Sequence, residues 1–232
     1  IHGARVPSGS PMILEVAEPG SKPGSKVVKV TPPGDGLKIT PSETVAITGH
    51  RVKDLDLPSG KIEMPNDSKV DAIKQSLGES IRKEIEAGKT TFISGMDEGV
   101  GLWAAEEVLS LKKDFPDIRL VAALAFKGQD EVMSAANQKR YQSILEKADG
   151  VIEKGWKPSK KAGEDFDPAY NSRSKLMQSI SGSSIVVHDG RKFGRTAQYL
   201  KDLPRRLHEE RITKIDPRNL HKSPAGTADL DP

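Results

Sequence analysis

Short apolar segments alternate with amphipathic segments along the middle of the chain. Five of the apolar segments are rich in β-branched residues, and they lie at residues 45–49, 91–95, 119–126, 150–154 and 184–188. Short, almost wholly apolar runs are typical of strands that are buried on both faces of a sheet. We therefore expect five strands in the interior of the protein.

Between these strands, apolar residues recur at steps of three and four, which is the period of a helix with one buried face. The series are Val70, Ile73, Leu77, Ile81 and Ile85, ended by Gly88; Trp103, Ala104, Val108 and Leu111; Ala135, Tyr141, Ile144 and Leu145; and Leu176, Met177 and Ile180. Strands that alternate with helices favour βαβ units and a parallel sheet. The predicted fold class is α/β, a Rossmann-like three-layer domain over residues 44–203.

The flanking segments have a different composition. Residues 1–43 are rich in Pro and Gly and contain two short β-like segments, 12–16 and 26–30. They are expected to form an extended arm or a small β appendage. Residues 204–232 are charged and contain Pro, and we expect a short helix followed by extended chain. A further loop at 155–170 is interpreted either as a lid beside a pocket or as a plain surface excursion.

Composition narrows the possible partners. The chain has 36 basic and 33 acidic residues without a basic stripe, so nucleic acid is not an expected partner. It has no Cys, no apolar run long enough for a membrane helix and no signal-peptide pattern. Histidines show no metal-ligand spacing, so no metal site and no cofactor are predicted. We expect a cytoplasmic protein, or alternatively a virion component.

Three glycine-containing loops follow predicted strands. They read TGHR from Thr48, SGMDEGVG from Ser94 and HDGRKFGRTAQYL from His188. Because the carboxyl ends of parallel strands meet at one edge of a sheet, these loops are expected to converge there. Bare backbone amides and helix N-termini at such an edge favour binding of an anion.

Individual residues of these loops have expected roles. Arg51 and Arg195 offer guanidinium groups to a phosphate, and His50 could donate to the phosphate or to a ribose. Asp97 and Glu98 bring negative charge to the second loop, where they oppose a phosphate unless they cap the following helix. Trp103 is interpreted as a core residue in preference to a base-stacking platform.

The segments TGHR, ISGMDEGVGLWAAEEVLSLKKDFPDIRLVAALAF, NQKRYQSILEKADGV and NSRSKLMQSISGSSIVVHDG, with GRT following, resemble the YpsA-like branch of the SLOG superfamily, which includes the DprA/SMF and Lonely Guy proteins. The resemblance covers about residues 45–200 and implies a Rossmann-like fold with a nucleotide-type pocket. With His50 and Arg195 added from the loops, the candidate ligand-binding residues are Gly49, His50, Arg51, Ser94, Gly95, Gly99, Trp103, Phe126, Gln129, Asn171, Arg173, Asp189, Gly194, Arg195 and Thr196.

One motif of the Lonely Guy enzymes is changed in this chain. Those enzymes carry PGGxGTxxE with a catalytic Glu, whereas this chain has Tyr199 at the Glu position and Arg195 at the second glycine of the triplet. The backbone amides remain although the carboxylate is gone. The resemblance therefore implies binding without turnover.

Three functions remain open at this point. The first is a binding module for a nucleotide or a nucleotide-derived ligand. The second is a structural or assembly protein that has protein partners through residues 1–43 and 204–232 and forms an oligomer or a larger complex; a first residue that is not Met suggests processing or excision from a longer chain. The third is a nucleotide N-glycosidic hydrolase that uses a carboxylate among Asp97, Glu98, Glu106 and Asp189.

Overall fold

A computed structural model describes residues 12–14, 28–30, 39–57, 66–154, 167–203 and 209–220. Eight strands form one sheet in the order β1-β2-β6-β5-β4-β3-β7-β8. Six of them, from β6 to β8, are parallel. Their bounds are Thr44–Gly49 (β3), Thr91–Ser94 (β4), Arg119–Leu124 (β5), Gly150–Lys154 (β6), Ser183–Val187 (β7) and Ile212–Ile215 (β8). The predicted α/β fold with a parallel sheet is confirmed.

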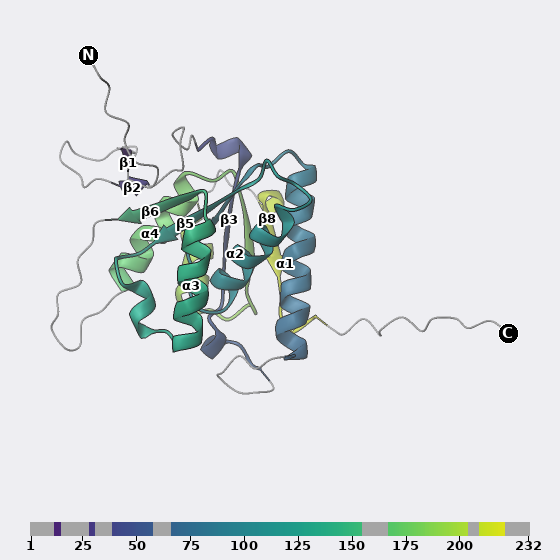
Figure 1. Cartoon of the computed structure of the whole chain (residues 1–232). Coiled ribbons are helices and arrows are strands. Elements are labelled where there is room, and N and C mark those ends of the chain that lie inside the picture. Colours follow the sequence, from purple (N-terminus) through teal and green to yellow (C-terminus); the bar gives the residue numbers. More distant parts are fainter. Residues whose placement is uncertain are drawn as a thin grey trace, which may run out of the picture.

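Helices cover both faces of this sheet (Figure 1). The α-helices are Ser68–Glu86 (α1), Val100–Leu111 (α2), Ala135–Lys147 (α3), Asp167–Ser179 (α4) and Arg195–Asp202 (α5). Short 3-10 turns lie at Pro41–Glu43 (η1), Val52–Asp54 (η2), Gln129–Val132 (η3) and Glu209–Arg211 (η4). Side-chain caps begin two helices, because Asp67 accepts hydrogen bonds from the amides of Lys69 and Val70 in α1, and Ser134 accepts one in α3.

Alternate residues of each strand enter two separate cores. In β3, Val45 and Ile47 pack with α1 and α2 on one face, whereas Ala46 packs with α4 and α5 on the other. The first core includes Trp103, and the second includes Tyr199. The period-two alternation of a strand thus produces the three layers, because successive side chains point to opposite faces of the sheet.

The sheet continues past residue 203, where the sequence placed the end of the domain. Residues Ile212–Ile215 form β8, which pairs in parallel with β7. The short helix and extended chain expected here match η4, Glu209–Arg211, and the strand that follows it. The sequence did not predict that this extended segment joins the sheet. The strand is only four residues long and alternates with Lys214, so its apolar signal is weak. Its pairing with β7 supplies the stabilisation that local propensity does not.

Two short strands extend the other edge of the sheet. Met12–Leu14 (β1) pairs antiparallel with Val28–Val30 (β2), and β2 pairs antiparallel with β6. Both strands fall within the β-like segments expected in the N-terminal arm. The rest of residues 1–38 lies outside the described residues, as do 155–166, 204–208 and 221–232. The predicted lid therefore cannot be placed, except that its last residues, from Asp167, begin α4.

None of the helices in the described part of the chain is both long enough and apolar enough to cross a membrane.

Candidate functional site

The loops after β3, β4 and β7 meet at the carboxyl edge of the sheet. The amide of His50 donates to the carbonyl of Val187 at 3.2 Å, and the amide of Val100, the first residue of α2, donates to the carbonyl of His50 at 3.2 Å. Gly49 is required at this junction because a Cβ there would lie 2.7–2.9 Å from atoms of Val100 and Val187. Backbone contacts thus hold the three loops together.

A small cleft opens among these loops and α4. It is lined by Thr48, Gly49, His50, Arg51, Asp54, Asp97, Arg173, Ser174, Arg191, Phe193, Gly194, Arg195 and Thr196. Its volume is about 70 Å³. Because one water needs roughly 10–15 Å³ of such space, the cleft accommodates several waters or one phosphate-sized group.

Four arginines line the cleft, and three of them form ion pairs with aspartates. Arg51 pairs with Asp54 at 2.9 Å, Arg173 with Asp97 at 2.5 Å, and Arg191 with Asp189 at 2.6 Å.

The fourth, Arg195, places its guanidinium carbon 3.7 Å from the ring centroid of Tyr170. This cation–π contact holds Arg195 at the cleft.

Arg173 closes the glycine loop after β4 from the cleft side. Its Nη1 donates to the carbonyl of Gly95 at 2.5 Å, and its Cζ lies 2.8 Å from where a Cβ on Gly95 would stand. The same carbonyl accepts a hydrogen bond from Gln129 at 3.0 Å, while the amide of Met96 donates to Ser94 Oγ at 3.1 Å. These polar groups of the loop therefore form hydrogen bonds within the protein.

In the glycine loop after β7, by contrast, Gly194 is exposed. Gly194 caps α5 with φ 100° and without a side-chain hydrogen bond. The first bond of the helix runs from the amide of Gln198 to the carbonyl of Gly194 at 3.0 Å. The amides of the first turn precede this bond and have no carbonyl within the helix to accept from them. Such an N-terminus carries partial positive charge and is suited to a phosphate.

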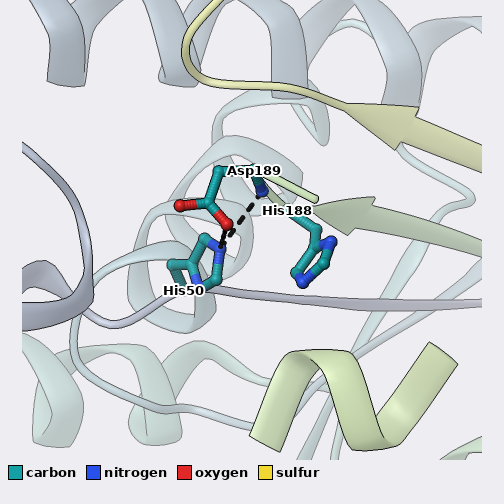
Figure 2. A group of neighbouring side chains, drawn as sticks. All are labelled: His50, His188 and Asp189. Carbon is teal, nitrogen blue, oxygen red and sulfur yellow. Dashed lines mark hydrogen bonds and ion pairs between the residues drawn. The ribbon is translucent and has the colours of Figure 1, made fainter. Parts of the chain in front are cut away.

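His50, which lines the cleft, forms a cluster with His188 and Asp189 (Figure 2). His50 Nε2 lies 3.0 Å from Asp189 Oδ1 and 3.2 Å from the Asp189 amide nitrogen. The rings of His50 and His188 stack with centroids 5.1 Å apart. Burial lowers the pKa of His50, and the Asp189 carboxylate offsets this only in part. The imidazole of His50 is therefore neutral at pH 7.

Arg191 controls the charge of this cluster. It holds both carboxylate oxygens of Asp189 and also donates to the carbonyl of Asp54 at 2.7 Å. These hydrogen bonds hold the pKa of Asp189 well below its usual range. Asp189 is therefore a fixed anion at physiological pH.

The same cluster has the composition of a metal site, which the spacing of the histidines did not indicate. One ligand atom from each of His50, His188 and Asp189 lies within 4.8 Å of the others. A metal ion would have to displace Arg191 from Asp189, and coordination through His188 Nδ1 would displace the amide of Gly190, 3.1 Å away. The contacts present are those of an ion-pair network that fixes the loop after β7.

The predicted site residues divide into two groups. Those that line the cleft are Gly49, His50, Arg51, Arg173, Gly194, Arg195 and Thr196. Those that do not line it are Ser94, Gly95, Gly99, Trp103, Phe126, Gln129, Asn171 and Asp189. Trp103 is fully buried in the first core, and Phe126 is buried in a small cluster with Tyr170, so neither aromatic ring reaches the cleft.

Several residues that line the cleft were not among the predicted site residues. They are Thr48, Asp54, Ser174, Arg191 and Phe193. Arg191 and Phe193 belong to the same loop segment as Gly194, so its glycines already marked the region. Asp54 and Ser174 carry no such signal, because a turn and the packing of α4 bring them to the cleft.

The fold and the cleft define a Rossmann-like α/β protein with an arginine-lined cleft at the carboxyl edge of its sheet. A model of the YspA SLOG family matches residues 45–220, and the chain belongs to this family. The resemblance seen in the sequence is thereby confirmed.

Bacterial relatives agree with this assignment. The chain is 28% identical over 180 residues to a UPF0398 protein of Halalkalibacterium halodurans, a match that covers 77% of this chain and 90% of the relative. It is 26% identical over 160 residues to a UPF0398 protein of Enterococcus faecalis, covering 69% and 83%. A UPF0398 protein of Staphylococcus epidermidis is 34% identical over 107 residues, covering 46% and 54%.

Proposed function

We propose that the chain binds a nucleotide or a nucleotide-derived small molecule, with a phosphate group of the ligand in the cleft, and that it does so without turnover. The observation that carries this proposal is the convergence of Arg195 with the open N-terminus of α5. Guanidinium groups and helix N-termini each favour phosphate. Arg51 and Arg191 line the same cleft, each paired with an aspartate.

Tyr199 supports binding in preference to catalysis. The Tyr199 side chain is buried in the second core, and its hydroxyl oxygen lies 3.0 Å from Ser184 Oγ. Burial raises the pKa of Tyr199 to about 12. Because the side chain is buried and does not line the cleft, it is not placed to act on a ligand there.

The carboxylates considered for hydrolysis are also engaged. Asp97 pairs with Arg173, and Asp189 pairs with Arg191. Glu106 pairs with Arg140 at 2.6 Å and does not line the cleft. Glu98 accepts a hydrogen bond from Asn137 at 2.5 Å. Of these four groups Asp97 lines the cleft, where Arg173 holds its carboxylate, so their contacts favour binding over hydrolysis.

Calorimetric titration of the purified chain with AMP and with ADP-ribose tests this function. We expect binding of at least one of them, weakened about tenfold or more by Arg195→Ala, because a hydrogen bond to a charged group contributes about 1.5–3 kcal/mol. Arg119→Ala is the matched control, since it removes the same charge from the exposed start of β5, at the opposite edge of the sheet. Absence of binding by both ligands, or equal effects of the two variants, would reject the proposal.

A further inference from the structure

The proposed ligand has a flat base. Among the described residues that line the cleft, Phe193 has an exposed ring able to receive it, whereas the ring of His50 is buried. Trp103 and Phe126 are buried in the cores and cannot serve. Phe193 lines the cleft and yet leaves 82% of its surface exposed. The described residues contain one other large exposed hydrophobic side chain, Val132, which lies on η3 and does not line the cleft.

The position of Phe193 relates it directly to the phosphate-binding groups. It immediately precedes Gly194, the N-cap of α5, and lies two positions before Arg195. A phosphate at the helix N-terminus would thus place the rest of the ligand beside this ring. An apolar ring that water surrounds gains free energy when a flat partner covers it.

We propose that Phe193 is the stacking platform for the base of the ligand, an inference that rests on the proposed function. The phosphate is held by Arg195 and α5, and the base lies against the exposed face of the phenyl ring. Because every nucleobase has a π face, stacking on Phe193 tolerates different bases. The cleft therefore selects nucleoside phosphates as a class and discriminates weakly between adenine and uracil.

A comparison of AMP, UMP and ribose 5-phosphate isolates the contribution of the base. The unmodified chain should bind AMP between about fivefold and 150-fold more tightly than ribose 5-phosphate, the range that base–aromatic stacking provides. UMP should also bind more tightly than ribose 5-phosphate.

Phe193→Ala should remove this preference and leave the affinity for ribose 5-phosphate unchanged. Phe193→Tyr should keep the preference, and Phe193→Leu, which retains apolar bulk without a ring, should lose most of it. Because the side chain is exposed, thermal melting of each variant should match that of the unmodified chain.

The outcomes separate this inference from the proposed function. If ribose 5-phosphate and AMP both bind and both lose affinity on Arg195→Ala, but Phe193→Ala leaves their ratio unchanged, Phe193 is not the platform although the cleft binds phosphate. The same conclusion follows if Phe193→Leu keeps the full preference. If none of the three compounds binds, the inference about Phe193 fails, and the proposed function fails with it unless ADP-ribose binds.

Discussion

The loops after β4 and β7 both contain glycines at a helix N-terminus but have opposite structures. In the first, the carbonyl of Gly95 accepts from Arg173 and Gln129, and Gly99 packs against the backbone of Val52. In the second, Gly194 is exposed and nothing lies within 4 Å of where its Cβ would stand. Glycine marks a place where backbone must approach something closely. The comparison teaches that only the fold decides whether the backbone around a glycine is covered by the protein itself or left open.

Alanine substitution of the two helix-capping glycines should give the largest contrast. Gly99 and Gly194 both have positive φ, 93° and 100°, so a side chain at either is strained by about 1–3 kcal/mol. A Cβ at Gly99 would also lie 2.7 Å from the amide nitrogen of Val52 and 3.0 Å from backbone atoms of His50 and Arg51. Gly99→Ala should lower the free energy of unfolding by about 4 kcal/mol and Gly194→Ala by about 2 kcal/mol, measured by urea denaturation. Equal losses of unfolding free energy in the two variants would contradict the difference in packing between the two loops.

Arg173→Ala should destabilise the closed loop by about 3 kcal/mol or more, because it leaves Asp97 without its buried partner. Urea denaturation at pH 7 measures this effect. The double variant in which Asp97→Asn is added should recover part of the loss, since an amide costs less to bury than an unpaired carboxylate. A loss under about 1 kcal/mol, the usual size for an exposed ion pair, would show that Arg173 is not essential to the loop.

Protonation of His50, which contacts Asp189 in the loop after β7, should destabilise the protein as the pH falls. The folded pKa of His50 is lowered by burial, so the unfolded chain takes up its proton first, near pH ~6.5. The contribution of neutral His50 to stability is therefore complete above the unfolded pKa. It is lost as the pH falls from the unfolded pKa toward the lower folded pKa. The free energy of unfolding should therefore decrease between pH 7 and pH 5.

His50→Gln should reduce the slope of this decrease. A smaller slope is expected and not a flat line, because burial lowers the pKa of His188 as well. Asp189 acts at lower pH, since Arg191 depresses its pKa, and its contribution is lost below about pH 4. An unchanged slope in His50→Gln between pH 7 and pH 5 would contradict the assignment to His50.

Arg51→Ala should have the smallest effect on stability. The pair between Arg51 and Asp54 is about one-third exposed at both side chains, so its loss should cost under about 1 kcal/mol in denaturation experiments. Its effect on AMP affinity should be larger than its effect on stability, because Arg51 lines the cleft. If Arg51→Ala lowers the stability more than it lowers the affinity for AMP, Arg51 has a structural role like that of Arg173.

The sequence alone predicted those strands and helices whose hydrophobic pattern is local. All five predicted strands are present, and the helical series that begin at Val70, Trp103 and Ala135 lie within α1, α2 and α3. It failed for β8, whose short mixed pattern is stabilised by pairing with β7. For the cleft, the glycines located the loops, but they gave no information on the orientation of the side chains. Phe126 illustrates this, since it is buried in a small cluster with Tyr170 and does not line the cleft.

By itself the sequence determined the layered α/β fold and the edge of the sheet where the loops meet, because hydrophobic period and glycine position act over a few residues. Tertiary structure alone decided which arginines are neutralised by aspartates and which loop stays open. Those outcomes depend on distances between segments far apart in the chain. The pairing of His50 with Asp189 and the covering of Gly95 by Arg173 arise only when β3, β4, β7 and α4 are assembled.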